Sequence, residues 1–114
     1  MKLILAIVKP FKVTEIVDAV HAEEDFPGLT VLDARGFGRE KTSAGEHSRG
    51  GDLHDFTDHS VLLIAVPAER TESYAEMVRS VAHTGRPGDG KVFTLDIDRA
   101  IRIGTGERGQ AALR

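Results

Sequence analysis

Two kinds of apolar pattern follow each other along the first third of the chain. Residues 3–8 form a continuous, β-rich apolar run that ends at Lys9-Pro10, and this length fits a buried strand better than a helix. A helical stripe with i, i+3, i+4, i+7 spacing comes next, formed by Val13, Ile16, Val17 and Val20. After a turn at 26–28, residues 29–35 return to strand character. The pattern therefore predicts a β-α-β unit.

The second half of the chain repeats this order. Residues 61–66 form another apolar run, which Pro67 closes. A second helical stripe contains Tyr74, Met77, Val78 and Val81, and Gly85 is expected to end the helix. Apolar and polar residues then alternate over 93–97, as in a half-buried strand. Two such halves predict an α+β protein with the ferredoxin-like βαββαβ fold.

A ferredoxin-like sheet carries both helices on one face and leaves the other face bare. We expect apolar residues of the strands, including Val92, to lie on the bare face. A bare apolar face of this kind predicts that copies of the chain associate to cover it.

Residues 38–59 lack any periodicity and are rich in Gly, Ser, His and Asp, so we expect a long exposed loop. Loops of about twenty residues inside a compact domain are commonly functional or disordered. Three histidines, His47, His54 and His59, alternate here with acidic residues and could ligate a divalent metal. Their spacing matches no standard metal motif, so an ordinary polar loop is the alternative.

Composition narrows the class of protein further. The 114 residues are 40% hydrophobic and 29% charged, which is typical of one globular domain. Cysteine is absent, which excludes disulfides, thiolate metal sites and cysteine nucleophiles. The longest apolar run, 3–8, is too short for a membrane span or a signal peptide. We therefore expect a soluble, cytoplasmic protein without direct membrane insertion.

Charge and side-chain chemistry argue against two functional classes. The net charge of −3 disfavours nucleic acid as a partner, because nucleic-acid binders usually carry a basic face. No combination of nucleophile, base and oxyanion donors emerges from the sequence, and asparagine is absent. We therefore expect a binding protein and not an enzyme, with no catalytic cofactor.

Three glycine-rich segments could hold an anionic ligand. Residues 84–91 contain three glycines, which let backbone N–H groups approach an anion, and Lys91 adds a positive charge. Residues 102–109 and 36–39 add Arg102 and Arg39, and residues 84–114 contain six basic against four acidic residues. A phosphorylated small ligand would suit these loops. Ordinary turns and a solvated tail remain the alternatives.

Taken together, the motifs resemble the P-II signal transduction family over nearly the whole chain. The segments that carry the resemblance are Val8-Lys9-Pro10-Phe11-Lys12, Gly36-Phe37-Gly38-Arg39, Thr84-Gly85, Gly88-Asp89-Gly90-Lys91-Val92-Phe93, Ile101-Arg102-Ile103 and Thr105-Gly106-Glu107. The resemblance implies one P-II-like domain over 1–114 that forms a homotrimer with nucleotide sites between neighbours. Its three named loops would be the T-loop (38–59), the B-loop (84–91) and the C-loop (102–109).

The resemblance also implies a function. Members of this family bind ATP or ADP, usually respond to 2-oxoglutarate, and present the T-loop to transporters and enzymes of nitrogen or carbon metabolism. The implied nucleotide-binding residues are Thr30, Gly36, Gly38, Arg39, Gly88, Asp89, Gly90, Lys91 and Arg102. The implied T-loop residues for effectors and partners are Glu40, His47, Ser48, Arg49, Asp52, His54 and His59.

Several positions depart from the family pattern. Gly104 stands where the family has a second C-loop arginine, so we expect ADP or AMP to bind at least as well as ATP. Glu40 replaces a glutamine that helps hold Mg²⁺ and 2-oxoglutarate, and His59 replaces a lysine that pairs with 2-oxoglutarate. Asp52 stands where many members have a tyrosine that is modified by uridylylation. The resemblance thus implies a divergent member, similar to relatives in which bicarbonate is a co-ligand. The alternatives are a metal sensor, a slow ATPase and a standard nitrogen regulator.

Overall fold

The computed structural model describes residues 1–39 and 56–114. Within these two stretches, each half of the fold contributes two strands and one α-helix, as the apolar pattern predicts. The first half contains β1 (Lys2–Val8), α1 (Val13–His21) and β2 (Thr30–Gly36). The second half contains β3 (Thr57–Val66), α2 (Thr71–Ala82) and β4 (Lys91–Asp96).

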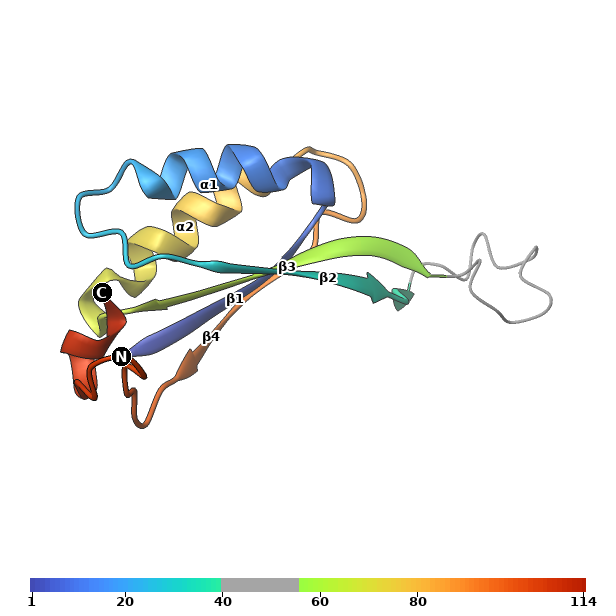
Figure 1. Ribbon diagram of the computed structural model, residues 1–114. Helices are drawn as coiled ribbons and strands as arrows, with labels where there is room; N and C mark the ends of the chain where they lie inside the picture. Colours follow the sequence, from blue (N-terminus) through green and yellow to red (C-terminus); the bar gives the residue numbers. More distant parts are fainter. Residues whose placement is uncertain (40–55) are drawn as a thin grey trace.

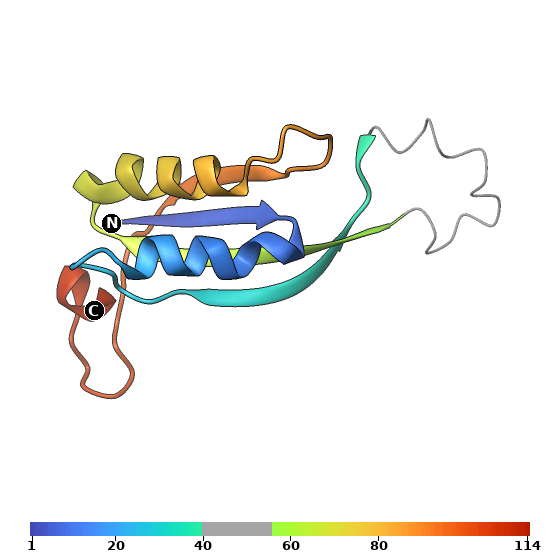
Figure 2. The ribbon, with the colours of Figure 1, turned by 90° about the horizontal axis from the view of Figure 1, so that it is seen from above.

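The four strands form one antiparallel sheet in the order β2-β3-β1-β4. Strand β1 is central, and its register runs from Lys2 opposite Val66 to Val8 opposite Ser60. Both helices lie over the same face of the sheet (Figure 1), side by side when the molecule is seen from above (Figure 2). The predicted ferredoxin-like α+β fold is therefore confirmed.

Alternation along the central strands places the core between the sheet and the helices. Every second residue of β1 and β3 is buried there, and the two helical stripes face them. Among the described residues, the largest fully buried side chains are Ile4, Val8, Leu62, Ile64, Val66, Ile16, Val20, Tyr74 and Val78. Burial of each such side chain contributes roughly 1.5–3 kcal/mol relative to leaving it exposed. The core thus anchors the strand ends from which the loops emerge.

The opposite face of the sheet is apolar and uncovered in the single chain. Phe93 and Leu95 of β4 are each 46% exposed, and Leu32 of β2 is 49% exposed. The prediction that Val92 lies on this face is wrong. Val92 is opposite Ala6 in the register, and opposite residues share a face, so it packs against the core on the helix side.

The loop predicted over 38–59 extends too far at its second end. Strand β3 begins at Thr57, which pairs with Gly36, so His59 belongs to the strand and is opposite Ala34. The β2–β3 ribbon projects past the rest of the sheet here (Figure 1), where no helix covers it. Polar residues are stable in such a ribbon because backbone pairing does not require an apolar face. In both described stretches, no helix is long and apolar enough to cross a membrane.

Candidate functional site

The B-loop between α2 and β4 is closed by the carboxylate of Asp89. The Thr84 backbone N–H donates to Asp89 Oδ2 at 2.8 Å, and the Thr84 hydroxyl donates to Oδ1 at 2.5 Å. The Arg86 N–H in turn donates to Thr84 Oγ1 at 3.0 Å. Asp89, which the resemblance assigns to the nucleotide, therefore directs both carboxylate oxygens into its own loop.

Lys9, which directly follows β1, completes this network. Its Nζ lies 3.2 Å from Thr84 Oγ1 and 3.2 Å from Asp89 Oδ1. The hydrogen bonds from Thr84 and, to a smaller extent, the Lys9 ammonium hold the pKa of Asp89 well below its usual range. Asp89 is therefore ionised at neutral pH. Neither Lys9 nor Thr84 was assigned to the site from the sequence, although both lie within the motifs quoted above.

Gly90 fixes the other end of the B-loop by close packing. It has a φ of +99°, and a Cβ at this position would lie 1.7 Å from the Ile7 carbonyl oxygen. Only glycine fits such a contact. At Gly85 nothing lies within 4 Å of a Cβ position, so that part of the loop backbone is open on its outer side.

A cavity of about 450 Å³ lies beside the B-loop, between α2 and the start of β4. Its lining includes Ile7 and Val8 at one end of β1, Ala75 and Arg79 of α2, and Lys91. The volume is within the usual range for small-molecule sites, about 300–1,000 Å³. Within the described residues Lys91 forms no ion pair, so its ammonium is available to an anion. The lining also includes the acidic residues Glu72, Glu76 and Asp89, so side chains of both charges border an apolar floor, with Lys91 at the glycine-rich edge.

Three predicted nucleotide-site residues lie around the end of β2. They are at the same end of the sheet as the B-loop, but at its opposite edge. Gly36 ends β2, and Gly38 and Arg39 follow it. The strand order places β3 and β1 between β2 and β4. At about 4.8 Å per strand spacing, the two edges are roughly 14 Å apart. Thr30 begins β2 on that same far edge, level with Leu63. One chain therefore does not bring all these residues together.

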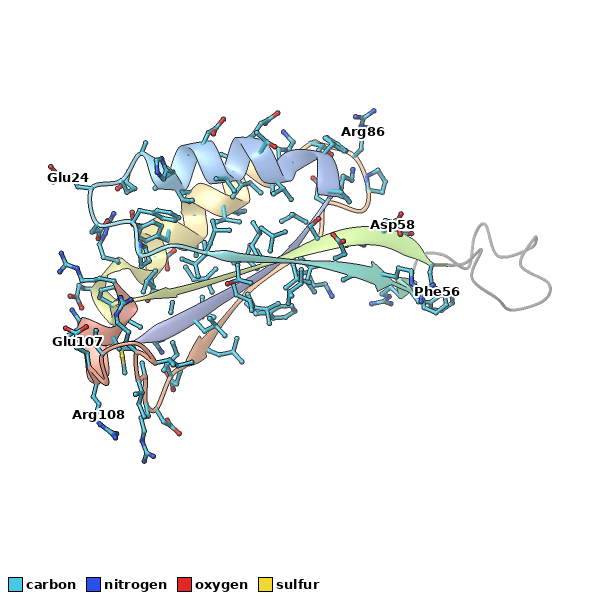
Figure 3. All side chains as sticks on the ribbon, viewed as in Figure 1. Glu24, Phe56, Asp58, Arg86, Glu107 and Arg108 are labelled. Atoms are coloured by element: carbon cyan, nitrogen blue, oxygen red, sulfur yellow. The ribbon has the colours of Figure 1, made fainter. Side chains whose placement is uncertain are left out.

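Arg102 lies even farther from the B-loop. Strand β4 leads away from Lys91 and brings Ile97 to the start of β1, where its N–H bonds the Met1 carbonyl oxygen at 3.0 Å. The C-loop follows at the opposite end of the molecule from the B-loop (Figures 1 and 2). Figure 3 shows the same separation in the positions of Arg86 and Glu107. Six strand residues alone span roughly 20 Å.

The C-loop is a closed turn in which both the backbone and the side chain of Arg102 contact Glu107 of the same loop. The Arg102 N–H donates to the Glu107 carbonyl oxygen at 2.8 Å, and the Gly106 N–H donates to the Arg102 carbonyl oxygen at 2.7 Å. The Arg102 Nε lies 3.4 Å from Glu107 Oε1. A Cβ on Gly104 would meet nothing within 4 Å, so this position has room for a side chain.

Most of the predicted T-loop residues lie outside the described residues. These are Glu40, His47, Ser48, Arg49, Asp52 and His54. His59 is described: its Nδ1 lies 3.3 Å from the Thr57 carbonyl oxygen, and its ring lies against Gly36. Over residues 1–39 and 56–114, no three His, Cys, Asp or Glu side chains are grouped as a metal would need. The three-histidine metal hypothesis therefore stays a prediction.

Comparison with known proteins identifies the family. A family model described as nitrogen regulatory protein P-II matches residues 1–107, and the chain therefore belongs to the P-II family. Two similar curated proteins, both named nitrogen regulatory protein P-II, come from Rhodospirillum rubrum (43% identical) and Azospirillum brasilense (40%). Nitrogen regulatory protein P-II 1 of Escherichia coli is 40% identical. Each of the three comparisons covers 99% of this chain and 100% of the relative.

A solved structure supports the same assignment. It is that of Arabidopsis thaliana PII bound to citrate, which is 32% identical to this chain, with a TM-score of 0.78. The match covers 97% of this chain and 90% of the Arabidopsis chain. The chain is thus similar to regulatory proteins of signal transduction in both sequence and fold.

Proposed function

We propose that this chain is a cytoplasmic regulatory protein that binds an adenine nucleotide between copies of itself. It then controls a transporter or an enzyme of carbon or nitrogen metabolism through its T-loop. The B-loop carries this proposal: a braced glycine-rich backbone lies beside a cavity of about 450 Å³, with Lys91 at its edge. Such a backbone offers N–H groups to phosphate oxygens, and Lys91 adds a charge.

A complete site needs a second copy of the chain. The C-loop, which carries the cation Arg102 proposed for the phosphates, lies at the opposite end of the molecule from the B-loop (Figures 1 and 2). Closed symmetric assembly brings the two ends of different copies together. The exposed apolar face, with Phe93 and Leu95 each 46% exposed, gives a physical reason for that assembly. We therefore propose a homotrimer with a nucleotide cleft between each pair of neighbours.

The preferred nucleotide follows from position 104. Since Gly104 replaces the second C-loop arginine of the family, one phosphate-directed charge is missing. ADP or AMP should therefore bind at least as well as ATP. Because the space around Gly104 is open, Gly104→Arg should be tolerated and should shift the preference toward ATP. Gly104→Ala is the matched control, and an unchanged ATP-to-ADP affinity ratio in Gly104→Arg would refute this reasoning.

The second ligand is proposed to be a small anion other than 2-oxoglutarate. Glu40 would repel an oxoacid, and His59 stands where the family has a lysine that pairs with 2-oxoglutarate. Bicarbonate is our first choice, with Mg²⁺ as an accompanying ion, while a solved relative is described as bound to citrate. Titrations with bicarbonate, citrate and 2-oxoglutarate, each in the presence of ADP and Mg²⁺, should show coupling with bicarbonate and none with 2-oxoglutarate.

Calorimetric titration with AMP, ADP and ATP at one fixed salt concentration tests the nucleotide site. Lys91→Gln should weaken binding by about tenfold or more, as expected for a charge-assisted contact. Arg86→Gln removes a charge from the same loop, but its side chain points away from the fold (Figure 3), so it should bind as the wild type does. No heat and no thermal shift with any of the three nucleotides at millimolar concentration would refute the proposed function.

A further inference from the structure

The two ends of the B-loop are anchored to the same place, the end of β1. Gly90 packs against the Ile7 carbonyl oxygen so closely that no side chain fits between them. Thr84, at the other end of the loop, and Asp89, next to Gly90, both meet the ammonium of Lys9, two residues after Ile7. The shape of this loop is therefore decided by residues 7–9, far from it in sequence.

Lys9 is held firmly enough to act as an anchor. Its side chain is only 19% exposed, and its Cε would lie 3.7 Å from a Cβ on Gly88. Pro10 follows it and begins the 3-10 turn Pro10–Lys12, and the Lys12 N–H donates to the Lys9 carbonyl oxygen at 3.0 Å. Proline restricts the backbone at both positions. The ammonium is thus presented from a stiff segment.

The charge of Lys9 is already used inside the loop. Asp89 Oδ1 accepts from the Thr84 hydroxyl and lies 3.2 Å from Lys9 Nζ. Asp89 Oδ2 accepts from the Thr84 N–H and lies 3.6 Å from His83 Nδ1. Because the Asp89 side chain is only 24% exposed, loss of Lys9 would remove the ammonium closest to a largely enclosed carboxylate. The turn would then open toward water to solvate that carboxylate.

We propose that Lys9 is a positioning residue for the B-loop, which holds Thr84 and Asp89 in place without contacting the ligand itself. Part of this proposal rests on the proposed function, because the ligand that benefits is the nucleotide phosphate. A loop that is ordered before binding loses less conformational entropy when the ligand arrives. Lys9 therefore raises affinity through the shape of the loop, whereas Lys91 raises it by direct attraction.

The two roles predict different dependence on phosphate number. A cation that contacts the phosphates directly contributes more to the affinity for ATP than to the affinity for AMP, and its contribution weakens as salt increases. A positioning residue contributes about equally to the affinities for AMP, ADP and ATP, because each nucleotide needs the same loop shape. Its contribution also depends little on salt, since the Lys9–Asp89 pair is largely enclosed.

The test compares Lys9→Met, which keeps the length and removes the charge, with Lys9→Arg, which keeps the charge. Lys12→Met is the matched control, because Lys12 lies on the same segment and pairs with Glu15 at 3.1 Å, outside the B-loop. Amide hydrogen exchange at Thr84 and Arg86 is measured without any ligand. We expect at least tenfold faster exchange in Lys9→Met, largely recovered exchange in Lys9→Arg, and no change in Lys12→Met.

Nucleotide affinity supplies the second measurement. Lys9→Met should weaken the binding of AMP, ADP and ATP by a similar factor of about ten, with little dependence on salt. Asp89→Asn tests the same contact if Lys9→Met fails to fold, and it should accelerate exchange at the same two amides. The double variant, Lys9→Met with Asp89→Asn, should bind nucleotide no more weakly than either single variant, because both substitutions remove the same Lys9–Asp89 interaction.

Two results would overturn the inference. One is unchanged exchange at Thr84 and Arg86 in folded Lys9→Met or, if that variant does not fold, in Asp89→Asn. The other is a loss of affinity that grows steadily from AMP to ATP, which would make Lys9 a direct phosphate contact. If the wild type binds no adenine nucleotide, the proposed function fails, and the exchange measurement alone decides whether Lys9 positions the loop.

Discussion

Replacement of Gly90 by alanine is the sharpest test of how the B-loop is built. The backbone at Gly90 has a φ of +99°, and an added Cβ would lie 1.7 Å from the Ile7 carbonyl oxygen and 2.8 Å from the Ile7 carbonyl carbon. Both atoms belong to the backbone of central strand β1, which cannot rotate out of the way. The loop and the strand would therefore have to separate by more than about 1 Å.

The structure allows the cost of this change to be divided into two parts. A left-handed backbone costs a non-glycine residue about 1–2 kcal/mol, and overpacking against a fixed neighbour adds about 1–3 kcal/mol. We therefore expect Gly90→Ala to lower the free energy of unfolding by about 3 kcal/mol. In a domain of this size, this lowers Tm by roughly 12 °C.

Two matched alanine substitutions separate the backbone cost from the overpacking cost. Gly85 has a φ of +86° but open space around a Cβ position, so Gly85→Ala should cost only the backbone part, about 1–2 kcal/mol. Gly104 has open space and no positive φ, so Gly104→Ala should change stability by less than about 0.5 kcal/mol. Thermal and urea unfolding at one fixed protein concentration measure all three. A Gly90→Ala variant no less stable than Gly85→Ala would refute the packing argument.

Three further predictions concern other parts of the molecule. Hydrogen bonds from Arg70 and Tyr74 lower the pKa of Asp25 to about 2, so its stabilising contribution is complete above pH 3.8 and is lost as the pH falls toward 2. Urea unfolding should therefore show a shallower loss of stability over this range in Asp25→Asn than in the wild type, and an equal slope would contradict the assignment. Glu107→Gln releases the Arg102 guanidinium and should tighten nucleotide binding by up to about fivefold in calorimetry, whereas weaker binding would count against it. Phe93→Glu places a charge on the bare sheet face and should reduce the molar mass measured by light scattering, and an unchanged mass would exclude this face from the assembly.

The regular elements could be predicted from the sequence because their apolar spacing is strict. The stripe that begins at Val13 became α1, and the run 61–66 became the buried part of β3. Residues 57–60 were missed because the β2–β3 ribbon is paired there without an apolar face. Val92 was placed on the wrong face because a short strand shows its two faces only through its register with β1.

The candidate site was predictable only in part. The glycines and Lys91 of the B-loop stand together in the sequence and could be assigned to a phosphate from local chemistry alone. Lys9 could not, since 75 residues separate it from Thr84, and the hydrogen bond between them exists only after β1 and α2 pack into one fold. For the same reason, the sequence did not predict that the Asp89 carboxylate points into its own loop. In the local sequence, Asp89 looks like any other polar loop residue.

By itself, the sequence determined the order of strands and helices, the glycine-rich loops and the family to which the chain belongs. These properties depend on spacing along the chain, and each residue carries its own hydrophobicity and backbone preference. Only the tertiary structure decided that Lys9, Thr84 and Asp89 form one braced loop and that the C-loop, which contains Arg102, lies at the far end of the molecule (Figure 1). Such distances arise from packing between segments that are remote in sequence, so no local pattern records them.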